Sequence, residues 1–190
     1  MDKKEDLRVI KTKKSLYDGL IMMMKDKPFE EIKVSDICKV ALTNRSTFYD
    51  HFNDKYELLY ALMKDLEDSL VSKLKTNTNT NISNSKEFYL KTIELLFEHV
   101  NENISIYSSI LKNNNNSVAY DMIRDTIMKD VKGHIESEQE YNSDIPIEVI
   151  TTFYVNAVIN VCSMCIRKPN QYTAEDMIRY LDKLIPDNLY

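Results

Sequence analysis

Residues 29–62 of this chain run FEEIKVSDICKVALTNRSTFYDHFNDKYELLYAL, and this stretch decides the fold. Two short amphipathic segments, 34–41 and 45–52, are separated by only three residues. A gap of that length holds a tight turn between two helices and nothing longer. The sequence therefore predicts a helix-turn-helix.

Both segments have one apolar face, and the second also has an unusual polar one. In the first, the residues at the spacing of one helix face are Val34, Ile37, Cys38 and Ala41. In the second, Phe48 and Phe52 form an i, i+4 apolar pair. Its other side chains are nearly all hydrogen-bond donors: Asn44, Arg45, Ser46, Thr47, Tyr49 and His51. Because donors suit phosphate oxygens and base edges, these six residues are the predicted DNA contacts.

The motif resembles the helix-turn-helix of the TetR family of bacterial transcriptional regulators. The matching positions are Val34, Ile37, Cys38, Ala41, Asn44, Arg45, Ser46, Thr47, Phe48, Tyr49, Phe52 and Lys55, with 57–62 continuing the pattern. The resemblance implies a cytoplasmic DNA-binding protein, most often a repressor, that acts as a homodimer on double-stranded DNA. It also implies phosphate contacts by Tyr49 and Lys55. The start of the helix that Lys55 opens is suited to an anion.

Two positions depart from the family pattern. Leu42 stands where the family usually has glycine, so the turn must either avoid a positive φ or carry strain. Lys33 stands where the family usually has a threonine, so the first motif helix is predicted to lack a side-chain N-cap.

Composition predicts an all-α protein. Two glycines and four prolines among 190 residues leave few signals for strands. The expected organisation is a three-helix DNA-binding domain over 1–55, with its motif at about 34–53, and a helical regulatory and dimerisation domain over 56–190. A first helix over 6–26 covers the motif, and Gly19 within it is interpreted as a site of close packing.

Charge is distributed unevenly along the chain. Residues 1–55 hold 12 Lys and Arg against 10 Asp and Glu, whereas 56–190 hold 13 against 20. An acidic protein binds DNA if its basic groups gather on one face. In residues 1–55 basic residues exceed acidic ones by only two, which leaves an alternative open. The alternative is a TetR-fold co-activator or protein-interaction module that does not bind DNA by itself.

After the motif, helical patterns are predicted at about 54–75, 88–101, 104–112, 117–139, 144–167 and 173–184. In the helix at about 54–75, leucines are expected to keep one face buried along its whole length. The segment 149–166 has no charged residue, and by length alone this segment could span a membrane. A polar line of Thr152, Asn156, Asn160 and Ser163 argues instead for a helix buried in its own domain and against a second subunit. The predicted homodimer therefore forms through the helices at about 145–167 and 173–185, with no membrane.

An enzyme is not expected, because no nucleophile is placed beside a base and the three histidines are scattered. No metal or cofactor motif occurs either. Cys162 and Cys165 form a C-x-x-C without a second ligand pair, so they are interpreted as ordinary buried thiols of a reduced compartment.

The effector is expected to be a small molecule or a protein of unknown identity. The residues predicted to line its site are Phe97, Tyr107, Met122, Phe153 and Tyr154. The competing interpretation is that these side chains simply fill the core.

Overall fold

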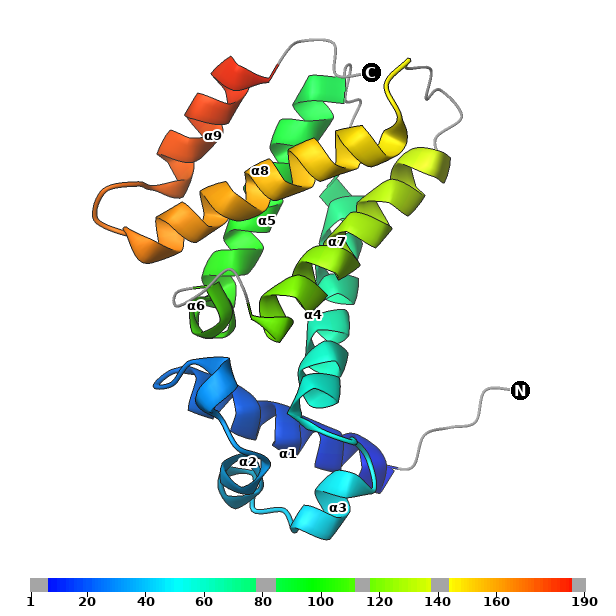
Figure 1. Cartoon of the computed structure of the whole chain (residues 1–190), viewed down its shortest axis with the longest axis vertical. Helices are drawn as coiled ribbons and strands as arrows, with labels where there is room; N and C mark the ends of the chain where they lie inside the picture. The colour runs from blue at the N-terminus through cyan, green and yellow to red at the C-terminus, as the bar shows by residue number, and fades with distance from the viewer. Residues whose placement is uncertain (1–6, 78–84, 112–116, 138–143, 186–190) are drawn as a thin grey trace.

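The computed structural model describes residues 7–77, 85–111, 117–137 and 144–185, and all regular structure in these ranges is helical (Figure 1). Helices α1 (Leu7–Met24), α2 (Val34–Val40) and α3 (Arg45–Tyr49) gather at one end, with a 3-10 helix, η1 (Phe29–Glu31), between α1 and α2. The all-α prediction and the helix-turn-helix are confirmed.

A long helix connects this end to the rest of the molecule. Helix α4 (Lys55–Asn77) has 23 residues, a length of about 35 Å, and runs from the helix-turn-helix into a second helical region (Figure 1). That region consists of α5 (Ser85–Glu102), α6 (Ile104–Leu111), α7 (Val118–Ser137), α8 (Ile147–Arg167) and α9 (Ala174–Leu184). The predicted helices are therefore present, and the one expected at about 88–101 is α5, which begins three residues earlier.

Capping residues fix where α4 and α9 begin. Before α4, the Asp54 carboxylate accepts hydrogen bonds from the backbone N–H groups of Tyr56 and Glu57, both at 2.8 Å. The Glu57 carboxylate accepts one from the backbone N–H of Asn53, the residue before the cap, at 2.6 Å. Thr173 caps α9 in the same way by accepting from the Asp176 N–H at 3.1 Å.

Helix α1 lies close against α2 because Gly19 has no side chain. A Cβ atom built there would lie 3.1 Å from both the Cβ of Ala41 and the carbonyl oxygen of Ile37. Leu16 and Leu20, on the same side of α1, are fully buried. The predicted packing role of Gly19 is confirmed, and any larger residue would push α2 away from α1.

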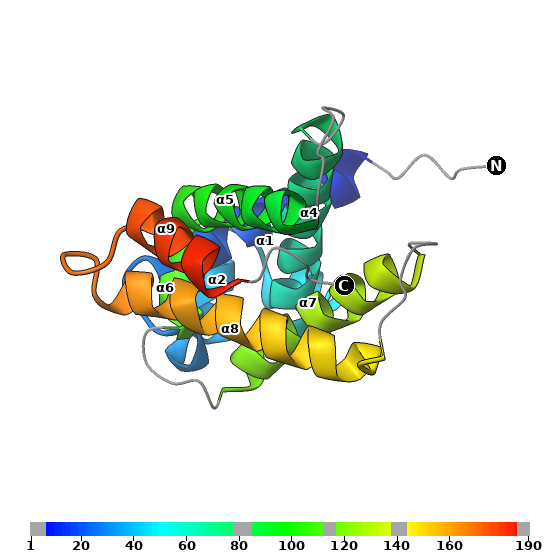
Figure 2. The same ribbon diagram turned by 90° about the horizontal axis from the view of Figure 1, so that it is seen from above.

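One buried cluster extends through both regions of the molecule. It joins Leu20, Phe29 and Phe48 of the helix-turn-helix end to residues of α6, α7 and α8 such as Ile106 and Val155. A second cluster lies between α5, α8 and α9, which are neighbours when the molecule is viewed from above (Figure 2). The helix-turn-helix is therefore packed against α6 as well as joined to α4.

Burial along α4 differs from the prediction. Leu58, Leu59 and Leu62 are buried, but Leu66 and Leu70, one and two turns further on, are only half-buried. The predicted continuous buried face of α4 is therefore limited to its first two turns. Further along α4, the Lys73 ammonium forms an ion pair with the Glu102 carboxylate of α5 at 2.6 Å.

Leu42 has a positive φ of 51° in the turn between α2 and α3, where its side chain is 95% exposed. A side chain in this conformation costs about 1–2 kcal/mol, and glycine removes that strain. Glycine also makes the unfolded chain more flexible, which offsets about 0.4–1 kcal/mol. We expect Leu42→Gly to raise the free energy of unfolding by about 1 kcal/mol in urea titrations.

The control for this prediction is Leu42→Ala, which removes the exposed leucine but keeps the strained backbone. It should give no stabilisation. An equal gain in both variants would mean that the exposed side chain, and not the backbone conformation, is unfavourable.

Candidate nucleic-acid interface

Helix α3 has only five residues and is held in place by two phenylalanines. Phe48 is fully buried and Phe52 is 4% exposed, with their ring centroids 5.9 Å apart. Since such a short helix is not stable alone, this anchorage is what presents its outer face in a fixed orientation.

The predicted DNA-contacting residues lie on or beside that outer face. Asn44 is the N-cap residue, in an extended conformation, and its side chain makes no capping hydrogen bond. Arg45 and Ser46, in the first turn, are exposed, and Tyr49 is 49% exposed. Thr47 and His51 are half-buried at the edges of this face. The structure therefore brings these six residues together on one end of the molecule.

Arg45 and Tyr49 are one helical turn apart and interact with each other. The Tyr49 hydroxyl is the main reason why the pKa of Arg45 is raised. The Tyr49 ring packs edge-on against Phe48, at a centroid distance of 5.4 Å. This packing restrains the Tyr49 ring before any ligand binds.

The Lys55 ammonium was expected to face a phosphate, but in the structure it contacts backbone carbonyl groups of its own chain. Its Nζ donates hydrogen bonds to the carbonyl oxygens of Phe29 at 3.0 Å and Glu30 at 2.8 Å, and the side chain is only 14% exposed. The ammonium also lies 4.8 Å from the centroid of the Phe29 ring. Burial lowers the pKa of Lys55, while Glu30 and Asp54 oppose this effect. The phosphate contact stays a prediction, and the geometry favours an internal role.

Lys33 is a candidate contact that the sequence analysis considered only as a missing cap. It occupies the N-cap position of α2 with no side-chain capping bond, as predicted, and it is exposed. The signal was present in the sequence, since a cation at the start of a helix opposes the helix dipole unless an anion binds beside it.

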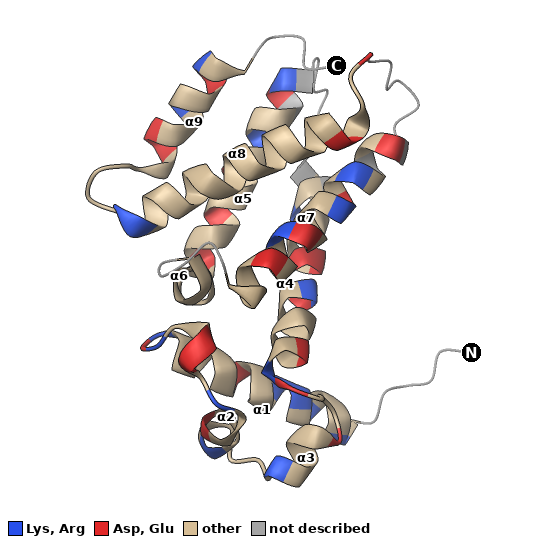
Figure 3. Ribbon diagram, viewed as in Figure 1, with Lys and Arg blue, Asp and Glu red and all other residues tan. Residues whose placement is uncertain are grey.

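The second region has an exposed apolar surface on α8 and α9, which we call the α8–α9 face. Its large exposed side chains are Val149 (55%), Phe153 (68%), Met164 (41%), Tyr180 (44%) and Leu184 (78%). Figure 3 shows that α8 has charged residues only near its ends. Helix α8 is apolar and long enough to cross a membrane, but core helices of soluble proteins pass the same test.

The polar line predicted along α8 is only partly present. Thr152 and Asn160 are exposed, but Ser163 is buried and donates to the Ile159 carbonyl at 2.9 Å. The Asn156 and Asn160 amides likewise donate to carbonyl groups one turn earlier, at 2.7 and 2.8 Å. Because the helix satisfies these donors itself, this face can be covered at little cost in lost hydrogen bonds.

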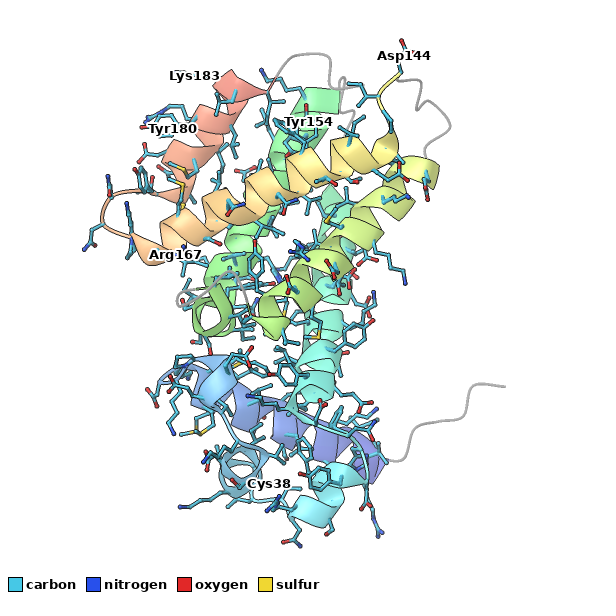
Figure 4. All side chains as sticks on the ribbon, in the orientation of Figure 1. Cys38, Asp144, Tyr154, Arg167, Tyr180 and Lys183 are labelled. Atoms are coloured by element: carbon cyan, nitrogen blue, oxygen red, sulfur yellow. The ribbon has the colours of Figure 1, made fainter. Side chains whose placement is uncertain are left out.

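The five residues predicted to line an effector site are not brought together. Tyr107 and Met122 belong to the first cluster, whereas Phe97 and Tyr154 belong to the second. The ring of Tyr154 packs toward α5, against the ring of Tyr89, with 5.4 Å between the ring centroids (Figure 4). Phe153 is 68% exposed on the α8–α9 face, whereas the adjacent Tyr154 is half-buried, because adjacent residues on a helix point in different directions. A contact of Phe153 with an effector stays a prediction.

His99 of α5 is a buried titratable group, 3% exposed, and its Nε2 lies 2.9 Å from the Tyr107 hydroxyl. Burial lowers the pKa of His99 below its ordinary value of 6.5; Lys73 lowers it further and Glu102 raises it. Between the lowered pKa and 6.5 the unfolded chain binds more protons than the folded one. The free energy of unfolding therefore decreases as the pH falls through this window.

This effect predicts the behaviour of His99→Gln. Glutamine still reaches the Tyr107 hydroxyl but does not titrate, so the variant should show a weaker dependence of stability on pH. Urea titrations at a series of pH values on both sides of 6.5 measure it. Equal pH slopes in the variant and the parent protein would contradict the assignment.

The two cysteines of the C-x-x-C in α8 are shielded from water to different extents. Cys162 is buried, and burial raises its pKa to about 12, which leaves the thiol unreactive. Cys165 is half-buried, and burial raises its pKa as well. Within the described ranges no group of three or more His, Cys, Asp or Glu side chains lies close enough to hold a metal ion.

Together, the helix-turn-helix with its donor-rich α3 and the helical second region define a transcriptional regulator. Two family models match the chain: "Bacterial regulatory proteins, tetR family" over residues 16–62 and "Transcriptional regulator C-terminal region" over 87–187. The chain belongs to the TetR family.

Individual relatives agree with this assignment. The HTH-type transcriptional regulator YxbF of Bacillus subtilis (strain 168) is 31% identical over 94 residues, which are 49% of this chain and 23% of that protein. The match thus spans less than a quarter of that relative.

Solved structures share the fold over nearly the whole chain. A putative TetR-family regulator from Syntrophomonas wolfei str. Goettingen has a TM-score of 0.76 at 16% identity, covering 93% of both chains. A TetR regulator from Streptococcus agalactiae 2603V has a TM-score of 0.66 at 22% identity, covering 95% of this chain and 96% of that one.

Proposed function

We propose that the protein is a cytoplasmic repressor that binds a near-palindromic operator as a homodimer and is released by an effector. The observation that carries the proposal is the outer face of α3, where Asn44, Arg45, Ser46 and Tyr49 lie exposed over a buried phenylalanine pair. The first residues of a recognition helix are those that reach base edges in the major groove. Asn44, Arg45 and Ser46 are assigned to bases, and Thr47, Tyr49 and His51 to phosphates.

The α8–α9 face supports the homodimer. Single exposed apolar residues are common, but five large ones on two adjacent helices are an apolar exposure that a second copy can cover. Two copies packed through these helices form a four-helix bundle. The dimer would hold two α3 helices about 34 Å apart or more, which fits half-sites on successive turns of DNA.

The effector is proposed to bind in the second region, where Phe97, Tyr107, Met122 and Tyr154 lie. An effector that binds there and changes the separation of the two α3 helices weakens operator binding. By linkage, operator DNA then weakens effector binding by the same factor.

Gel-shift titration of DNA fragments from the flanking genomic locus, at two salt concentrations, tests the proposal. We expect one fragment to bind more tightly than random duplex, with an affinity that falls as salt rises because phosphate contacts release counterions. Equal affinity for all fragments would contradict sequence-specific binding.

A second candidate is a co-activator that binds another protein rather than DNA. It is favoured by the charge balance of residues 1–55, which hold only two more basic than acidic side chains. In the same titrations such a protein would leave every duplex unbound even at low salt.

A further inference from the structure

The segment between α1 and α2 contacts both α4 and α6 through its backbone carbonyl groups. Ser109 of α6 donates from its hydroxyl to the carbonyl oxygen of Lys27 at 2.7 Å, although 82 residues separate the two in sequence. Lys55 of α4 donates to the carbonyl oxygens of Phe29 and Glu30. We call these three carbonyl groups, of Lys27, Phe29 and Glu30, the carbonyl joint.

Both donors reach the joint from partly or fully buried positions. Ser109 is 9% exposed, and the Lys55 side chain is 14% exposed. Hydrogen bonds shielded from water are stronger than exposed ones, and a buried hydroxyl that loses its acceptor is costly. The Tyr56 hydroxyl adds a hydrogen bond to the Glu30 carboxylate at 2.5 Å, beside the Lys55 contacts. Few alternative arrangements can satisfy all of these donors.

Helix α6 is also tied to α8 at the same end, two residues beyond Ser109. The Arg167 guanidinium, at the end of α8, donates from Nε and Nη2 to the carbonyl oxygen of Leu111, at 3.1 and 2.9 Å (Figure 4). Leu111 is the last residue of α6, so only the last turn of this helix lies between α8 and the carbonyl joint. A displacement of α8 therefore reaches the helix-turn-helix through α6, along a path separate from α4.

We propose that the carbonyl joint sets the angle of the helix-turn-helix against the second region, and that Ser109 and Lys55 are positioning residues for DNA binding. The inference rests on the proposed function, because the angle matters to the extent that two α3 helices must match two half-sites. Ser109 and Lys55 themselves touch no DNA in this role. They restrict the directions in which α3 points.

A distance measurement without DNA tests the proposal. Spin labels are attached to cysteines introduced at two exposed positions, Asp50→Cys at the end of α3 and Lys129→Cys on α7. The protein also carries Cys165→Ser, so that its remaining native cysteines are both buried. Labelled chains are diluted with unlabelled protein, so pulsed electron resonance reports the distance within one chain. We expect a narrow distribution in the parent protein and a broader one in Ser109→Ala and in Lys55→Met.

Two further variants make the test specific. Ser108→Ala changes the neighbouring serine of the same helix and should leave the distribution narrow. Ser109→Thr keeps the hydroxyl and should restore the narrow distribution. An unchanged distribution in Ser109→Ala would overturn the proposal, and so would equal broadening in Ser108→Ala.

Operator titration separates this inference from the proposed function. Ser109→Ala should bind a specific duplex about threefold to tenfold more weakly, the equivalent of one hydrogen bond, and should tolerate altered half-site spacing. If the parent protein binds no duplex, the proposed function fails while the distance measurement still decides whether the joint exists. Broadened distances with unchanged spacing preference would overturn the positioning role.

Discussion

Phe153→Asp is expected to convert the protein into a monomer and to weaken operator binding by about 10²–10⁴-fold. A two-fold interface brings the same residue from both copies to the same surface, so two new carboxylates would be buried near each other. The loss of affinity follows because each half-site must then bind without the effective concentration that its partner provides. Sedimentation at micromolar protein and gel-shift titration measure the two effects.

Val118→Asp is the matched control for this substitution. Val118 is 60% exposed at the start of α7, away from the α8–α9 face, so the variant places the same charge on an apolar surface residue elsewhere. It should remain dimeric and bind the operator normally. A dimeric Phe153→Asp protein would show that another surface holds the two copies together.

Arg45→Ala is expected to lose discrimination between the operator and related sequences by about 1–3 kcal/mol, the range for a bidentate contact to a base. Arg45 is the basic residue in the first turn of α3, and its side chain is exposed. The measurement compares affinity for the operator with affinity for single-base variants of it.

Arg45→Lys separates charge from geometry. Lysine keeps the positive charge but lacks the planar fork of donors. We therefore expect it to retain affinity for random duplex and to lose base preference. If Arg45→Ala weakens operator and random DNA equally, Arg45 contacts phosphate and not a base.

The fold was predictable from the sequence because local signals and packing agree. The apolar spacing of 34–52 and the small Gly19 each specify a nearby structure. For Leu42 the sequence left two alternatives open, and the structure has the strained one, with a φ of 51°. Burial beyond Leu62 was overestimated because periodicity shows which face is apolar, not how many neighbours cover it.

The site was predictable only for the residues on one helix. The exposed face of α3 follows directly from helical spacing. Lys55 does not, because the carbonyl oxygens that it contacts lie 25 and 26 residues earlier in the chain. Phe153 and Tyr154 are neighbours in sequence, and composition alone did not indicate that one faces outward and the other inward. Contacts between distant segments decided each of these cases.

The single apolar cluster that runs from Phe48 to Val155 has a consequence for protein engineering. A chimaera that joins residues 1–55 to the C-terminal half of another regulator would set Phe29 and Leu20 against helices that evolved with different partners. New DNA specificity is better introduced by grafting only the outward side chains of α3, since these leave the shared interior intact.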